Sequence, residues 1–140
     1  YDQLIWTDAL EHKYVEECGT MNAMFVLNGT LISPETSDTV LDGVTRNSVI
    51  VVARDLGIPV EIRKLSVNEL KEALENGTLT EAFGAGTAAT IKPMSEIGIG
   101  GKRYPLSDSD GWQIVPWLLR ELDGMRRGAI ADRFNWNIPV

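Results

Sequence analysis

Short apolar runs separated by turn residues form the main pattern of the chain, and they predict a series of strands. Asn28-Gly29 lies between two such runs, and this dipeptide tolerates the positive φ angles of a tight hairpin turn. Residues 81–91 are small, apolar and glycine-rich, which predicts one buried strand interrupted by a tight backbone passage. A second hairpin is predicted over residues 97–104. The other predicted strands cover residues 1–6, 23–27, 30–33 and 60–65.

Three further segments carry the apolar spacing of helices. Gly57 follows the first and can supply its left-handed end. Ser66 and Glu69 open the second as a capping box. Pro116 lies near the start of the third and marks either its first turn or a kink. The predicted helices cover residues 46–56, 66–76 and 112–127.

About six strands and three helices, partly in βα order, predict a mixed α/β (α+β) fold. No repeat or linker interrupts the pattern, so residues 1–140 are predicted to form a single domain. The apolar side chains of the last twelve residues include Phe134 and Trp136, and we expect this tail to dock on the rest of the molecule.

The composition fits a packed globular protein and narrows its function. The chain has 140 residues, of which 44% are hydrophobic, and a net charge of −7, which argues against nucleic-acid binding. No apolar run approaches the ~20 residues of a membrane span. Cys18 and His12 are the only residues of their types, which excludes an internal disulfide and argues against a metal site. These features favour a soluble protein of the reducing cytoplasm.

Two segments could hold an anion. The first, Leu41–Arg46, precedes a predicted helix, where Gly43 would let the backbone approach a phosphate and unpaired N–H groups would bind it. The alternative is an ordinary helix start with Thr45 as N-cap and Arg46 in solvent. The second, Gly84–Ala88, could form a nest of N–H donors around Thr87, or could simply allow close packing of a strand. Neither segment matches the P-loop or dinucleotide fingerprint.

A third segment, Glu16–Asn22, places two carboxylates before a Gly-Thr turn. A buried Glu here could pair with a cationic ring nitrogen, whereas the alternative is a solvated acidic turn. Cys18 in the same segment is interpreted as a small buried side chain, because no His/Asp pair accompanies it as a nucleophile would require.

In chain order, the three segments are Glu17-Cys18-Gly19-Thr20-Met21-Asn22, Leu41-Asp42-Gly43-Val44-Thr45-Arg46 and Phe83-Gly84-Ala85-Gly86-Thr87-Ala88. This ordered set resembles the C-terminal part of the branched-chain amino-acid aminotransferases, which are pyridoxal-phosphate enzymes of fold type IV. The resemblance implies a twisted, antiparallel-rich mixed sheet, as in the D-amino-acid-aminotransferase-like fold. It covers nearly the whole chain.

The resemblance also implies roles for individual residues. Glu17 matches the carboxylate that pairs with the pyridine nitrogen of pyridoxal 5′-phosphate. Val44 and Thr45, after Gly43, match donors to the cofactor phosphate, with Leu41 beside the ring. Thr87 matches a further phosphate ligand. The residues that match positions near the substrate carboxylate are Thr20, Thr87 and Ala88, the last through its backbone.

The same resemblance implies that this chain is incomplete. The family's Schiff-base lysine and its small N-terminal domain lie upstream of the Glu17 segment, and none of the lysines here matches a catalytic position. The chain begins with Tyr1, not Met, and with strand-like residues. We therefore expect a C-terminal portion of the large domain, inactive alone, with no catalytic or metal-binding residue of its own.

The parent enzyme is expected to be a homodimer that transfers amino groups between leucine, isoleucine or valine and 2-oxoglutarate, without nucleic-acid or membrane partners. Two alternatives stay open. One is another fold type IV enzyme, such as a D-amino-acid transaminase or an aminodeoxychorismate lyase. The other is a non-catalytic module that binds an anion or a partner.

Overall fold

The computed structural model describes residues 2–106 and 111–138. Its elements are β1 (Ile5–Thr7), β2 (Val15–Cys18), β3 (Met21–Leu27), β4 (Thr30–Ser33), α1 (Val44–Asp55), β5 (Val60–Ile62), α2 (Val67–Glu75), β6 (Leu79–Gly86), β7 (Thr90–Pro93), β8 (Glu96–Ile99), β9 (Lys102–Pro105) and α3 (Ile114–Arg126). No helix in these described ranges is long and apolar enough to cross a membrane.

The main sheet is built around β3, whose five central residues are all buried. β2 and β4 pair with β3, and β6 pairs with it over the long register from Asn22↔Ala85 to Leu27↔Leu79. β1, β5 and β7 extend the sheet from β2, β4 and β6 respectively, and only the β4–β5 pair is parallel. β8 and β9 form a separate hairpin. The mixed α/β class and the antiparallel-rich sheet are therefore confirmed.

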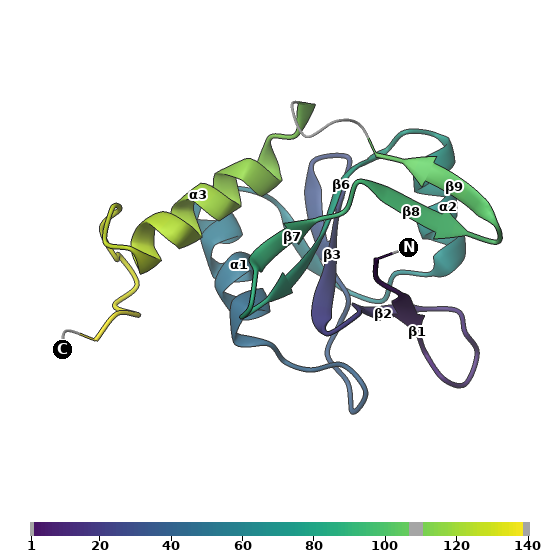
Figure 1. The fold of residues 1–140 in the computed structure, drawn as a ribbon, viewed down its shortest axis with the longest axis horizontal. Coiled ribbons are helices and arrows are strands. Elements are labelled where there is room, and N and C mark those ends of the chain that lie inside the picture. Colours follow the sequence, from purple (N-terminus) through teal and green to yellow (C-terminus); the bar gives the residue numbers. More distant parts are fainter. Residues whose placement is uncertain (1, 107–110, 139–140) are drawn as a thin grey trace.

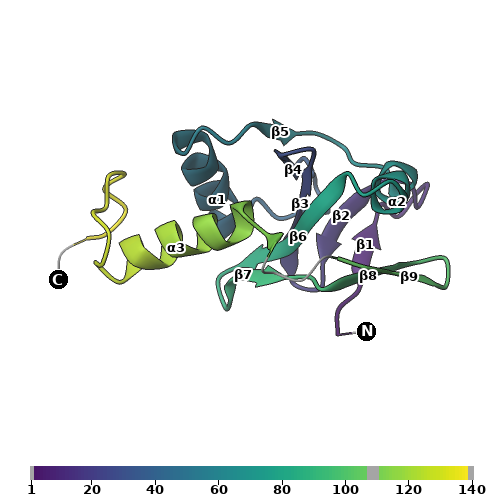
Figure 2. The ribbon, with the colours of Figure 1, turned by 90° about the horizontal axis from the view of Figure 1, so that it is seen from above.

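The helices lie at two ends of the molecule. Figure 1 shows α1 and α3 together at one end, whereas α2 lies at the other end, where its Glu75 contacts Tyr104 of β9. Figure 2 shows the same arrangement from above, with the C-terminal tail extending beyond α3. The core between them includes Phe25 and Phe83 from the central strands, Val49 from α1 and Leu118 from α3, all fully buried.

Several elements that were predicted from short sequence motifs are present in the structure. Asn28 and Gly29 have φ angles of 49° and 76°, as the tight β3–β4 turn requires. The Ser66 hydroxyl accepts a 3.0 Å hydrogen bond from the Glu69 backbone N–H and starts α2. The Glu69 carboxylate does not complete the capping box, because it pairs with Arg63 at 2.6 Å. Pro116 lies in the first turn of α3, where a missing backbone N–H costs no helical hydrogen bond.

Other predictions were wrong in detail. The single strand expected over 81–91 is two strands, β6 and β7, joined by a turn at 87–89. β2 was not predicted, because its two consecutive glutamates obscure the apolar alternation. The strand expected over 60–65 ends at Ile62, where its pairing with β4 ends.

The C-terminal tail docks through hydrogen bonds and through Ile130 and Phe134, which pack against the core. Arg133 bridges the two neighbouring helices, donating to Asp55 of α1 at 2.7 Å and to Glu121 of α3 at 3.0 Å. Phe134 and Trp136 stack with ring centroids 4.6 Å apart. The expectation of a docked tail is confirmed, and its residues become part of a cavity beside the start of α1.

Candidate functional site

Glu17 lies on β2, opposite Asn22 of β3 in the hairpin register. Its Oε1 accepts hydrogen bonds from the Leu41 backbone N–H at 3.0 Å and from Asn22 Nδ2 at 3.3 Å. Among the described residues, no hydrogen bond is made to its second oxygen. The neighbouring Glu16 differs, because its carboxylate accepts the Thr39 hydroxyl at 2.8 Å. Glu17 is therefore a held, half-buried carboxylate and not part of a solvated acidic turn.

The start of α1 is shaped to receive an anion. Gly43 is the N-cap, so no side chain caps the N–H groups of the first turn, and that turn contains no acidic residue. These N–H groups lack partners within the helix and carry its positive dipole end. An ordinary helix start was expected to have Thr45 as its N-cap. The helix begins one residue earlier, at Val44, so Thr45 lies inside its first turn.

Arg46 is buried and does not supply free charge to this helix start. Its Nε donates to Ser33 Oγ at 2.9 Å and its Nη2 donates to the Pro34 carbonyl at 3.1 Å. Its Nη1 pairs with Asp42 at 3.3 Å. Burial lowers the pKa of the guanidinium, and the charge of Asp42 opposes that shift. The alternative of an ordinary helix start with Arg46 in solvent is wrong, since the side chain binds α1 to the loop after β4.

Thr87 lies in the turn between β6 and β7 and borders the same space as the start of α1. Val44, Thr45 and Thr87 line one cavity of about 260 Å³. The tail and α3 supply its other walls, with Arg126, Asp132, Trp136 and Asn137 among them. Two segments that are far apart in the sequence thus meet at one cavity. The uncapped helix start and four hydroxyl side chains, those of Thr45, Ser48, Thr87 and Thr90, border it.

The other residues expected at the site lie around it. Leu41 is exposed and borders, together with Glu17, a separate open cavity of about 550 Å³. Thr20 is exposed in the β2–β3 turn, and Ala88 is exposed in the β6–β7 turn. Neither lines the cavity at the start of α1. No group of three His, Cys, Asp or Glu side chains suited to a metal occurs in the described part of the chain.

The two glycines before Thr87 serve close packing. A Cβ at Gly84 would lie 2.8 Å from Met21 Cε, and one at Gly86 would lie 2.9 Å from Met21 Cγ. Real Cβ atoms do not approach other atoms this closely, so the Met21 side chain fills the space that the glycines leave. The close-packing interpretation of this segment holds for Gly84 and Gly86, while Thr87 is the residue that reaches the cavity.

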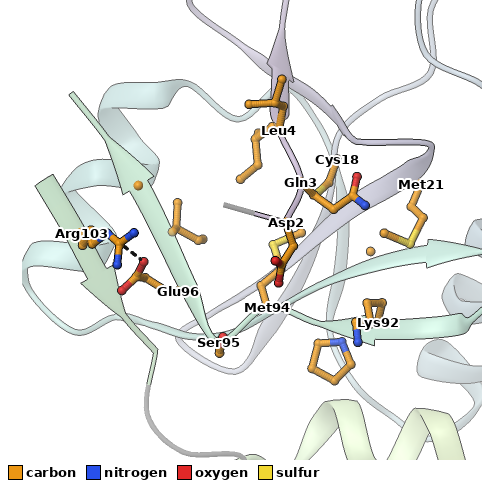
Figure 3. A pocket seen from close by; sticks show the side chains of 15 residues that line it. Asp2, Gln3, Leu4, Cys18, Met21, Lys92, Met94, Ser95, Glu96 and Arg103 are labelled. Atoms are coloured by element: carbon orange, nitrogen blue, oxygen red, sulfur yellow. Dashed lines mark ion pairs between the residues drawn. The ribbon is translucent and has the colours of Figure 1, made fainter. Parts of the chain in front are cut away.

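A further cavity of about 400 Å³ lies between the N-terminal segment and β7–β8 (Figure 3). Met21 and Lys92 border it, and Glu96 pairs with Arg103 along its rim at 3.5 Å. Met21 is next to Asn22 on β3, so the two side chains point to opposite faces of the strand. Lys92 therefore lies on the face away from Glu17, and nothing in this geometry makes it a substitute for a catalytic lysine.

Asn22 is the main site residue whose role could not be predicted from the sequence. It is 5% exposed on a strand whose next four residues are apolar and buried. The one sequence feature that could have indicated its importance is an amide side chain at the start of such an apolar run. Its partners, Glu17 and Leu41, could not be paired with it from the sequence alone.

Comparison with known proteins places this geometry in a family. Residues 1–97 match the family described as Amino-transferase class IV. The chain belongs to the class IV aminotransferases. The matched range contains all three segments, including Glu17, the start of α1 and Thr87.

Curated members of the family align with the whole chain. It is 41% identical over 140 residues to "Branched-chain-amino-acid transaminase 1" of Bacillus subtilis, strain 168. It is 39% identical over the same length to a "Probable branched-chain-amino-acid aminotransferase" of Staphylococcus aureus, strain N315. In both cases the alignment covers 100% of this chain but 39% of the relative. The chain thus spans about two fifths of the length of these curated relatives.

Solved structures of the family share the fold. A branched-chain aminotransferase of Thermoproteus uzoniensis with norvaline superposes with a TM-score of 0.80 at 30% identity, over 99% of this chain and 42% of that one. The enzyme of Escherichia coli gives 0.79 at 26% identity, over 97% and 42%. A third branched-chain aminotransferase, solved with pyridoxamine 5′-phosphate, gives 0.77 at 28% identity, over 96% and 41%. The predicted resemblance to branched-chain aminotransferases is confirmed.

Proposed function

We propose that this chain forms the pyridoxal-phosphate-binding part of a branched-chain amino-acid aminotransferase, which transfers amino groups between leucine, isoleucine or valine and 2-oxoglutarate. The observation that carries the proposal is the cavity where the uncapped start of α1 meets Thr87. The names of the curated relatives support the choice of reaction over other fold type IV chemistries.

The residues present fit a phosphorylated pyridine cofactor. A phosphate needs several N–H or O–H donors, and the cavity offers the first-turn N–H groups of α1 with the hydroxyls of Thr45 and Thr87. A Cβ at the N-cap Gly43 would collide with Asn22 Oδ1, so the glycine keeps the backbone close to its neighbours there. Glu17 is joined to this helix start through Leu41, two residues before the N-cap.

In this proposal each group has a defined task. The α1 N–H groups, Thr45 and Thr87 bind and orient the phosphate. Glu17 holds a proton at the pyridine nitrogen, and its bond to the Leu41 N–H fixes the direction of its carboxylate. The protonated cofactor ring, when bound, supplies the electron sink for the substrate carbanion. Thr20, Thr87 and the Ala88 backbone are proposed to lie near the substrate carboxylate, and Leu41 beside the ring.

The lysine that the family joins to its cofactor, the small domain and the dimer partner are proposed to come from outside these 140 residues. The chain alone is accordingly proposed to be a single-domain, inactive portion of the large domain. The enzyme is proposed to be a homodimer and to act in the cytoplasm. The one free cysteine of the chain fits a reducing compartment.

The test compares the full-length parent protein with the 140-residue chain, both supplied with pyridoxal phosphate, leucine and 2-oxoglutarate. Glutamate production by the parent and none by the isolated chain is the expected result. In the parent, Glu17→Gln should lower kcat by about a hundredfold, as loss of a preorganised charge at the reacting group does elsewhere. Glu16→Gln is the matched control and should leave kcat unchanged. In parallel assays of the parent, turnover only when a D-amino acid replaces leucine, or release of pyruvate from added aminodeoxychorismate, would instead indicate another fold type IV reaction.

A further inference from the structure

One buried amide touches both halves of the proposed cofactor site. Asn22 Nδ2 donates to the Leu41 carbonyl at 2.7 Å and to Glu17 Oε1 at 3.3 Å. The Leu41 N–H donates to the same Glu17 oxygen at 3.0 Å. Glu17, Asn22 and Leu41 therefore form a closed ring of hydrogen bonds, in which Asn22 supplies the link that comes from the rigid central strand.

The same side chain also sets the position of the α1 N-cap. Asn22 Oδ1 lies against Gly43, where an added Cβ would collide with it. The Gly43 N–H donates to the Leu41 carbonyl at 2.9 Å, the carbonyl that Asn22 also holds. Gly43 has an extended backbone, with φ −69° and ψ 134°, so the glycine is needed here for space and not for a left-handed conformation.

Asn22 reaches the third segment of the site through the backbone. It pairs with Ala85 on β6, which is followed by Gly86 at the end of the strand and then by the turn that carries Thr87. Because Asn22 is 5% exposed on a strand paired on both sides, it has little freedom to move relative to either neighbour. One residue thus connects the strand of Glu17, the loop before α1 and the strand before Thr87.

We propose that Asn22 is a positioning residue that fixes the distance and direction between the ring-facing carboxylate of Glu17 and the phosphate-facing start of α1. The inference rests on the proposed function, since it names what that site needs to stay preorganised. Asn22 itself touches no reacting atom. Without its amide, Glu17 keeps the Leu41 N–H as a donor, but the Leu41 carbonyl and the N-cap lose their attachment to β3.

The first test measures the protein without cofactor. In the full-length apo-protein, Asn22→Ala should speed hydrogen exchange in peptides covering residues 41–46, because the Leu41 carbonyl that accepts the Gly43 N–H is no longer held. Asn22→Asp keeps the shape but removes both N–H donors, and it should give the same local change. Ser66→Ala, which removes the cap of the distant α2, is the control for general destabilisation. It should leave exchange of residues 41–46 unchanged.

The second test measures pyridoxal-phosphate affinity by titration of its absorbance band. Asn22→Ala should weaken binding by at least about tenfold, as loss of hydrogen bonds to a charged group does. The Asn22→Ala/Glu17→Gln double variant should lose less affinity than the two single variants predict together, because Asn22 acts through Glu17. A purely structural role would make the losses additive.

The outcomes separate the two proposals. Unchanged exchange at residues 41–46 in both Asn22 variants overturns the positioning role, even if the enzyme binds its cofactor. Equal losses of affinity in Asn22→Ala and Ser66→Ala overturn it as well. A wild-type parent that binds no pyridoxal phosphate refutes the proposed function instead, while faster exchange in the Asn22 variants would still show that the amide positions the α1 start.

Discussion

The start of α3 depends on a carboxylate that lies 32 residues earlier in the chain. Glu81 of β6 is 4% exposed, and its Oε1 accepts from the N–H groups of Gln113 and Ile114 at 2.8 and 3.0 Å. Its Oε2 accepts from the Val115 N–H at 2.7 Å. The N-cap residue Gln113 makes no side-chain cap of its own. Glu81 therefore acts as an N-cap from another element, and we predict that its removal strongly destabilises the protein.

The size of the effect follows from the burial of the three donors. Gln113 is exposed and Ile114 is half-buried, so water can replace the carboxylate at their N–H groups. Val115 is 2% exposed, and its N–H would be left unpaired at a cost of about 1–3 kcal/mol. Loss of a negative charge at the helix N-terminus adds about 0.5–2 kcal/mol. Glu81→Ala should therefore lower the free energy of unfolding by about 1.5–5 kcal/mol.

Urea denaturation of the protein at pH 7, followed by circular dichroism, measures this difference directly. Glu81→Gln retains one acceptor oxygen and should lose about half as much stability as Glu81→Ala. Glu72→Gln, at an exposed position of α2, is the matched control and should change stability by less than about 0.5 kcal/mol. A Glu81→Ala protein within about 0.5 kcal/mol of wild type would refute the capping role.

Three further predictions concern the site and its surroundings. Gly43→Ala should lower the free energy of unfolding by about 1–3 kcal/mol, because the added Cβ collides with Asn22. Urea denaturation measures the loss, and an unchanged midpoint would mean that the loop relaxes freely. Arg46→Lys should lower the free energy of unfolding by about 2 kcal/mol, because an ammonium group cannot donate to both Ser33 Oγ and the Pro34 carbonyl. An unaltered thermal unfolding midpoint would contradict this. The backbone N–H groups of Tyr14 and its neighbours lower the pKa of Asp8 from its usual value of 3.8, so the stability it contributes is present above that pH and lost as the pH falls below it. Asp8→Asn should therefore flatten the pH dependence of unfolding below about pH 4, and an acid limb identical to wild type would argue against it.

Features encoded by neighbouring residues were predictable from the sequence. The Asn28-Gly29 turn and the Ser66 cap each depend on contacts within a few residues, and both formed as expected. Features made by distant residues were not. Glu81 gave no sign of its partners on α3, and Arg46 gave no sign of the buried loop oxygens that it binds.

The candidate site likewise combines features made by neighbouring residues, which were predictable, with features made by distant residues, which were not. The uncapped start of α1 could be suggested from Gly43 and the helix that follows, because helix starts have a local pattern. That Val44 and Thr87 border one cavity depends on the β3–β6 pairing and on the docked tail, which no local pattern encodes. The roles of Thr20 and Ala88, and the choice of Glu17 over Glu16 as the carboxylate at the ring nitrogen, came only from the family resemblance. They stay predictions.

The pairing of β3 with β6 also determines when the site can come into existence during folding. The hairpin that carries Glu17 and the first turn of α1 are local and can form early. Thr87 joins them only after β6 has closed a loop containing β4, α1, β5 and α2. Closure of so long a loop has a large entropic cost before its contacts form, and such steps are slow. We therefore expect the cavity at the start of α1 to form late in folding, because it cannot be complete before β6 pairs with β3.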